Sequence, residues 1–124
     1  MLAQEYRLKK KRDFEITFEN GRFVGGALAT MKYWKIDPVK YPRRNYSLQD
    51  LKIGFVVSMK VSKKAVVRNR LKRQMREVIR LLLKEKGFPL GFLVLFFAKK
   101  EMIDQSFEDI HKDIYGMLRR ARLI

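Results

Sequence analysis

The sequence predicts an α+β fold, a single-domain α/β sandwich whose elements follow the order helix, strand, strand, helix, strand, helix. Three segments repeat apolar residues with a helical period, and three others are rich in aromatic and β-branched residues. The 124 residues can bury a substantial core but are too few for two ordinary domains. We therefore expect residues 1–124 to form one unit.

The chain opens with basic residues and then a short amphipathic stretch. Residues 1–10 are expected to form a loose basic arm. A helix is predicted over 13–20, because Phe14 and Phe18 lie four apart and therefore share one face. Gly21 follows at the position of a helix stop.

An extended stretch and a long loop come next. Residues 23–36 alternate as a strand does, and Gly25 and Gly26 mark a bend that could divide this stretch into two strands. Residues 37–50 contain two prolines and no regular period, which predicts a connecting loop. Its two neighbouring arginines are expected to be exposed.

The remaining strands and the last helix follow from apolar patterning. Residues 51–58 read as a strand, and 91–98 read as another that is apolar on both faces and therefore central in the sheet. Residues 104–122 form an amphipathic pattern that predicts a helix covering the sheet. Its apolar positions are Phe107, Ile110, Ile114, Met117, Leu118 and Ala121.

Residues 60–86 are the most distinctive part of the chain. They hold eleven Lys or Arg against two Glu, which is nine of the sixteen net positive charges. One face of the predicted helix is apolar. On the opposite face positive side chains lie close together, and an external anion is needed to offset their repulsion. A polyanion meets this need, because its counterions are released on binding. We therefore expect a nucleic acid as the partner. The apolar stripe is Val67, Leu71, Met75, Val78 and Leu82, and the basic face includes Lys72, Arg73, Arg76, Arg80 and Lys84.

Several functional classes lack support in the sequence. Cysteine is absent, which excludes thiol chemistry and disulfides and fits a cytoplasmic setting. The longest apolar run, 88–98, is too short to span a membrane. His111 is the only histidine and has no catalytic partner at a recognisable spacing, and the acidic residues of 104–122 are expected to form its solvent face. We expect no metal site and no catalytic residue in the protein.

Charge and helix pattern alone leave alternatives open. A ribosomal or other structural RNA-binding protein would have the same electrostatics. A module that binds an acidic membrane or partner protein would need the apolar stripe of 60–86 to be exposed, although the predicted sheet requires that stripe for its own cover.

Two motifs point to one family. The basic helix reads Arg68-Asn69-Arg70-x-Lys72-Arg73-x-x-Arg76-Glu77, and the strand before it ends Ile53-Gly54-Phe55-x-Val57-Ser58-x-Lys60. The N-terminal region reads Arg7-Leu8-x-x-x-x-Asp13-Phe14-x-x-x-Phe18-x-x-Gly21. Together they resemble the bacterial ribonuclease P protein component over roughly residues 7–121.

The resemblance implies a fold and a function. The fold would be like domain 2 of ribosomal protein S5, with a left-handed strand-helix-strand crossover between residues 51 and 98, where general rules favour a right-handed one. The protein would join a large catalytic RNA that removes the 5′ leader from precursor tRNA. Mg²⁺ would be held mainly by that RNA and none by the protein alone.

The resemblance also implies two sets of binding residues. Contacts to the catalytic RNA would come from Arg68, Asn69, Arg70, Lys72, Arg73, Arg76 and Arg80. A cleft for the single-stranded leader would be formed by Phe14, Phe18, Lys32, Tyr33, Phe55, Lys60, Lys63 and Lys64. One departure is Met59, which stands where the family usually has a basic residue.

Overall fold

The computed structural model describes residues 2–124, and its elements confirm the predicted fold class. The predicted strand over 23–36 is divided in two, so the order becomes α-β-β-β-α-β-α. The helices are α1 (Lys11–Asn20), α2 (Ala65–Glu85) and α3 (Phe107–Arg120), and the strands are β1 (Arg22–Gly25), β2 (Ala29–Lys35), β3 (Leu51–Val56) and β4 (Phe92–Ala98). Short 3₁₀ helices lie at Gln4–Tyr6, Pro42–Arg44 and Lys100–Met102.

The four strands form one mixed sheet in the order β1-β2-β4-β3. β1 and β2 form an antiparallel hairpin, β2 pairs antiparallel with β4, and β3 pairs parallel with β4. As predicted, the apolar 91–98 segment forms an interior strand of the sheet, β4. Its residues are buried alternately against the two faces, with Val94 and Phe96 in one cluster and Leu93 and Leu95 in the other.

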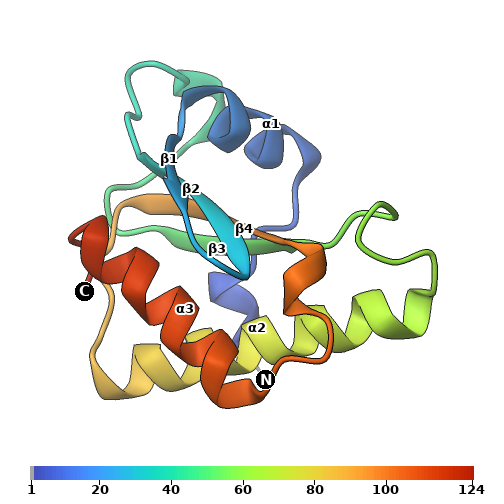
Figure 1. Cartoon of the computed structure of the whole chain (residues 1–124). Coiled ribbons are helices and arrows are strands. Elements are labelled where there is room, and N and C mark those ends of the chain that lie inside the picture. The colour runs from blue at the N-terminus through green and yellow to red at the C-terminus, as the bar shows by residue number, and fades with distance from the viewer. Residues whose placement is uncertain (1) are drawn as a thin grey trace.

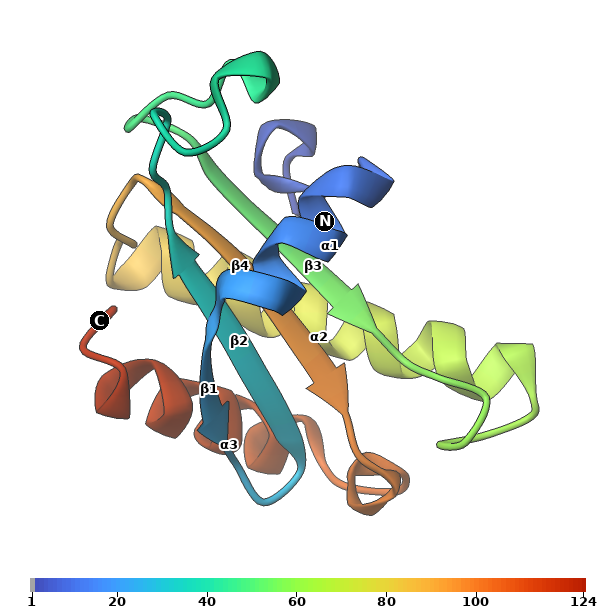
Figure 2. The same ribbon diagram turned by 90° about the horizontal axis from the view of Figure 1, so that it is seen from above.

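The helices cover the two faces unequally. Figures 1 and 2 show α1 alone on one face of the sheet, while α2 and α3 lie on the other. The larger apolar cluster lies under α2 and α3 and includes the predicted stripe residues Leu71, Met75, Val78 and Leu82, all at most 1% exposed. The smaller cluster lies under α1 and is centred on Ile16 and Trp34.

The crossover from β3 through α2 to β4 has the unusual hand. Seen from the α2 side with both strands pointing upward, β4 lies to the left of β3, so the crossover is left-handed (Figure 2). The family resemblance implied this hand, and the general preference for right-handed crossovers would have given the wrong answer.

The prediction of a loose arm over residues 1–10 was wrong for the described residues 2–10. Leu2 is 1% exposed and belongs to the larger cluster, and Leu8 is 6% exposed in the smaller one. The Leu8 amide donates to the Ile53 carbonyl at 3.1 Å, and Arg7 makes a parallel bridge to the same residue. The segment is therefore fixed along the open edge of β3, because two leucines bury apolar surface there.

We predicted that the acidic residues of the last helix face solvent, but one residue of α3, Asp113, does not. The Asp113 carboxylate accepts hydrogen bonds from the amides of Ala27, Leu28 and Ala29 at 2.8–3.1 Å and so holds the turn between β1 and β2. Gly26 fits beside it because a side chain would meet this carboxylate at 2.8 Å. The predicted bend at Gly25 and Gly26 is this turn.

The helix stop at Gly21 has a different cause from the one expected. The backbone of Gly21 is extended, with φ −70°, so no left-handed conformation is needed. A Cβ at this position would lie 2.5 Å from the Thr17 carbonyl oxygen, and steric space therefore requires glycine here. Among residues 2–124, no helix is both long enough and apolar enough to cross a membrane.

Candidate nucleic-acid interface

An apolar hollow of about 270 Å³ lies between α1 and the sheet. Its floor is formed by Phe14 and Phe18 of α1 together with Val56 of β3, Leu95 and Phe97 of β4. Two α1 carboxylates, Glu15 and Glu19, complete the lining. An apolar floor with negative groups beside it suits an uncharged planar group better than a phosphate.

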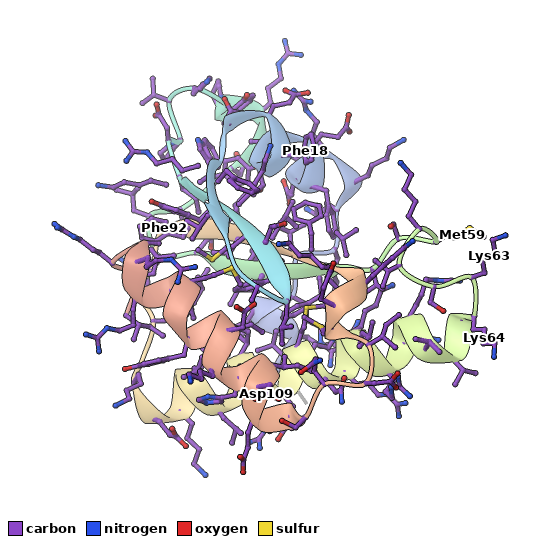
Figure 3. All side chains as sticks on the ribbon, in the orientation of Figure 1. Phe18, Met59, Lys63, Lys64, Phe92 and Asp109 are labelled. Carbon is purple, nitrogen blue, oxygen red and sulfur yellow. The ribbon has the colours of Figure 1, made fainter. Side chains whose placement is uncertain are left out.

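Phe14 and Phe18 occupy this hollow in different ways. Phe14 is partly buried, and its ring lies over Gly54, where a Cβ would come within 3.0 Å of the ring. Phe18 is 54% exposed and meets Phe97 edge to face at a centroid distance of 6.0 Å. Phe14 therefore anchors α1 to β3. Phe18, which is labelled on α1 in Figure 3, offers aromatic surface to solvent.

Lys32 contacts the exposed ring of this hollow, although it does not itself line the hollow. Its Nζ lies 3.9 Å from the centroid of the Phe18 ring and donates to the Phe18 carbonyl at 2.9 Å. A cation over one ring face attracts the π electrons and fixes the ring. Lys32 and Phe97 thus contact parts of the ring, and a planar ligand would meet Phe18 on the surface that they leave exposed.

The basic face of α2 is presented as the sequence predicts, but its members differ in their surroundings. Asn69 and Arg73 are exposed, whereas Arg68, Arg70, Lys72 and Arg76 are half-buried. Arg68 donates to the Ser62 carbonyl at 3.0 Å, at the start of the helix.

Arg80 differs from the other basic residues of α2, because it forms a two-pronged ion pair with Glu77 at 2.6 and 3.0 Å. This pairing lowers the pKa of Glu77 and raises the pKa of Arg80. Arg80 is thus partly neutralised within the protein, and the remaining basic residues carry the positive face.

A second hollow, of about 410 Å³, connects α2 to the α1 side of the molecule. Phe14 and Phe55 lie on one part of its wall, and Lys72 and Arg76 of α2 lie on another. Because Phe14 lines both hollows, the aromatic surface beside α1 continues into a basic surface on α2. The two predicted sets of binding residues therefore adjoin one another.

Not every predicted cleft residue reaches the apolar hollow. Tyr33 packs against Phe92 on the larger cluster, so the structure does not bring it to α1. Phe55 also points to that face, where it stacks on Phe96, and it reaches the second hollow only from the edge of the sheet.

The lysines of the loop between β3 and α2 line neither hollow. Lys60, Lys63 and Lys64 are exposed, and Figure 3 shows Met59, Lys63 and Lys64 on the part of the chain between β3 and α2, away from α1. Met59 is 65% exposed and leaves an apolar group on an otherwise basic segment.

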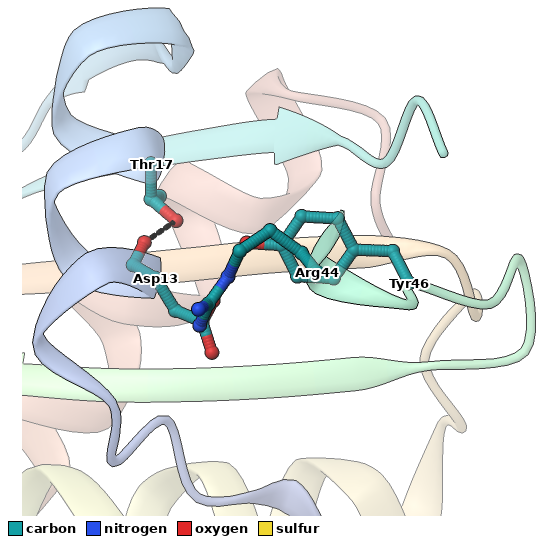
Figure 4. Close-up of polar contacts among 4 residues, drawn as sticks. All are labelled: Asp13, Thr17, Arg44 and Tyr46. Atoms are coloured by element: carbon teal, nitrogen blue, oxygen red, sulfur yellow. Dashed lines mark hydrogen bonds and ion pairs between the residues drawn. The ribbon is translucent and has the colours of Figure 1, made fainter. Parts of the chain in front are cut away.

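A polar cluster behind the hollows is the main feature that sequence reasoning missed. Both Arg44 and Tyr46 donate to one oxygen of the Asp13 carboxylate, at 2.7 and 2.6 Å (Figure 4). The contact ties the 37–50 loop to the first turn of α1, so Arg44 is not the exposed residue that we predicted. Thr17, which is fully buried, donates to the Asp13 carbonyl at 2.8 Å. Asp13 thus fixes the helix that carries Phe14.

This cluster changes the acid–base behaviour of its members. Burial, followed by the hydrogen bond to Asp13, raises the pKa of Tyr46 to about 12. The same carboxylate raises the pKa of Arg44. Within residues 2–124, no three His, Asp or Glu side chains lie close enough to hold a metal ion.

Comparisons with known proteins give a consistent result. The model of a family described as Ribonuclease P matches residues 2–122. A ribonuclease P protein component from Cyanothece sp. is 33% identical, with all of this chain and 98% of that relative aligned.

Solved structures agree with the sequence comparisons. The RNase P protein from Thermotoga maritima has a TM-score of 0.70 and 26% identity, covering 92% of this chain and 96% of that one. The RNase P protein from Staphylococcus aureus has a TM-score of 0.76 at 22% identity, covering 95% of this chain and 96% of that one.

Replacing Tyr46 with Phe should remove one late step from an alkaline titration of tyrosine absorbance. The chain has five tyrosines, and a raised pKa means that Tyr46 stays neutral while pH rises through its ordinary value near 10. The stabilisation that Tyr46 gains from its neutral form is complete below pH 10 and is lost toward pH 12. Tyr115→Phe is the matched control and should remove an early step, because its hydrogen bond from Arg119 lowers the pKa of Tyr115. Full ionisation of all five tyrosines by pH 11 in the original protein would contradict the Asp13 cluster.

Proposed function

Because the chain belongs to the ribonuclease P protein family and is the protein component of that tRNA-processing endoribonuclease, we propose that it binds a catalytic RNA and the 5′ leader of precursor tRNA on adjoining surfaces. The basic face of α2 grips the catalytic RNA, and the hollow beside α1 takes the leader. The observation that carries this proposal is the sharing of Phe14 by the apolar hollow and by the hollow that Lys72 and Arg76 line.

The chemistry of each surface suits its RNA. A structured RNA presents phosphates and a regular shape, which a row of arginines recognises without reading base edges. A leader is single-stranded and variable in sequence, and aromatic stacking suits it because every base has a π face. Phe18 is the exposed ring in the hollow, so it is the principal stacking residue in this proposal.

The cleavage chemistry is assigned to the RNA. Mg²⁺ supplies charge stabilisation and an activated water in phosphodiester hydrolysis. In the described chain, carboxylates and the single histidine do not cluster in the way that binding such an ion requires. The protein's basic residues instead neutralise the repulsion between phosphates, and the protein positions the leader. We propose that the protein acts in the cytoplasm. The family match favours this function over a ribosomal or other structural RNA-binding role without a catalytic partner.

Arg73→Ala should weaken the binding of the protein to a bacterial ribonuclease P RNA. The loss should be the same whichever precursor tRNA is present. Arg73 is exposed on α2, so its loss should leave the fold intact and remove a phosphate contact. In a plot of log affinity against log salt, the slope should fall by about 0.9, the value for one phosphate contact with a duplex. Lys100→Ala, an exposed lysine outside α2, is the control. An unchanged slope in the Arg73 variant would contradict the assignment of the α2 face.

Phe18→Ala should weaken binding of precursor tRNA while sparing mature tRNA. Loss of one stacked base costs about 1–3 kcal/mol, or roughly 5- to 150-fold in affinity. The matched control is Phe23→Ala, which removes a ring that is 64% exposed on β1 and does not line the hollow. Affinities of the assembled enzyme for both tRNAs provide the measurement. Equal loss for precursor and mature tRNA would mean that the hollow does not bind the leader.

A further inference from the structure

The 37–50 loop is anchored on the sheet and reaches α1 from there. Trp34 of β2 is 7% exposed and meets the rings of Tyr41 and Tyr46 edge to face, at centroid distances of 5.7 and 5.6 Å. Tyr46 also donates to Asp13 in the first turn of α1 (Figure 4). The loop therefore has a fixed base on a buried ring, from which its side chains can hold the helix.

The loop holds α1 at a second place, Asn20, which is the last residue of the helix. The Asn20 Oδ1 accepts a hydrogen bond from Lys40 Nζ at 2.6 Å, and its Nδ2 donates to the Tyr41 hydroxyl at 2.9 Å. The same Nδ2 donates to the Ile16 carbonyl at 2.8 Å. An amide suits this position because it accepts and donates at once. Asn20 thus links the loop to the last turn of the helix.

The last turn of α1 depends on such contacts. It carries Phe18, which is 54% exposed, and a helix of ten residues is marginal without tertiary contacts. Two carbonyls of this turn are bound by side chains, since Asn20 donates to that of Ile16 and Lys32 donates to that of Phe18 at 2.9 Å. Hydrogen bonds therefore contribute more than burial to the position of Phe18.

The two contacts with the loop lie on one side of α1. Asp13 and Asn20 are seven residues apart, which is nearly two full turns. Phe14 and Phe18 lie roughly a third of a turn further around the helix, where they line the apolar hollow. A shift of α1 away from the loop would therefore change the contact between Phe18 and Phe97, whose ring centroids are 6.0 Å apart.

We propose that Asn20 and Tyr41 are positioning residues for leader binding: through them the 37–50 loop keeps Phe18 where its ring can stack on a base. This inference rests on the proposed function, because it needs a base on Phe18. Neither Asn20 nor Tyr41 lines the apolar hollow, so both act on the leader through Phe18. The loop thereby contributes to substrate affinity without contacting the RNA.

The test removes the contact from the side of the loop with the smallest possible change. Tyr41→Phe deletes the hydroxyl that accepts from Asn20 and leaves the ring that packs on Trp34. The charge of the protein does not change. The matched control is Tyr115→Phe, which deletes a hydroxyl that accepts from Arg119 at 3.2 Å on α3. Asn20→Ala removes the same contact from the side of the helix.

Each variant is made alone and together with Phe18→Ala, and the affinities of the assembled enzyme for precursor and mature tRNA are measured. Tyr41→Phe should weaken precursor binding about 2- to 10-fold, the range for one neutral hydrogen bond, and should leave mature tRNA binding unchanged. Asn20→Ala should cause an equal or larger loss, because it also frees the Ile16 carbonyl. In the Phe18→Ala background neither change should cause a further loss. Tyr115→Phe should have no effect in either background.

Three results would overturn the inference. A loss that persists in the Phe18→Ala background would show that Tyr41 does not act through Phe18. An equal loss for precursor and mature tRNA would show a general effect on folding or assembly. Unchanged precursor binding would show that Phe18 keeps its position without the loop. If Phe18→Ala alone still weakens only precursor binding, the proposed function stands and this extension alone fails. If Phe18→Ala alone has no such effect, the proposed function itself fails.

Discussion

The burial of β4 on both faces is the constraint on which the rest of the molecule depends. Its central residues Leu93, Val94, Leu95 and Phe96 are all at most 1% exposed, so the sheet needs a layer on each side. Two helices supply one layer completely. On the other side, α1 has only ten residues and leaves part of the sheet uncovered near Val56 and Phe97. The apolar hollow is this uncovered part.

The position of α1 is set by a few contacts of different kinds. Phe14 can approach β3 closely because Gly54 has no side chain. The Asp13 carboxylate joins the first turn of α1 to Arg44 and Tyr46, so the loop that precedes β3 braces the helix. Leu8 brings the N-terminal segment to the edge of β3. Residues from four parts of the chain thus shape the adjoining hollows.

Electrostatics and packing are separated in α2. The apolar stripe gives the helix its stability, since four of its five predicted residues are fully buried. The opposite face keeps like charges together, with Glu77–Arg80 as its ion pair. Such a face is costly without a counter-anion, and a bound polyanion removes that cost. The same stretch of sequence therefore serves the core and the proposed RNA contact through opposite faces of one helix.

Features with a regular period could be predicted from the sequence, and those that depend on distant partners could not. The α2 stripe and the interior position of β4 follow from local patterns. The pairing of Asp13 with Arg44, and of Asp113 with the turn at Ala27–Ala29, joins residues 31 and more than 80 positions apart. The resemblance placed both Lys32 and Tyr33 in the cleft, but neighbouring strand residues face opposite sides of the sheet, and only Lys32 reaches α1. The prediction of a loose arm was wrong because it relied on the basic residues of the segment and gave no weight to Leu2 and Leu8, which are buried.

The most direct test of the division of labour between protein and RNA is cleavage of a precursor tRNA at low Mg²⁺. The protein alone, a bacterial ribonuclease P RNA alone, and the two together would be compared. We expect efficient removal of the leader only in the mixture, because the protein supplies charge neutralisation and leader binding while the RNA supplies the active site. Cleavage by the protein alone, or no enhancement in the mixture, would contradict this account.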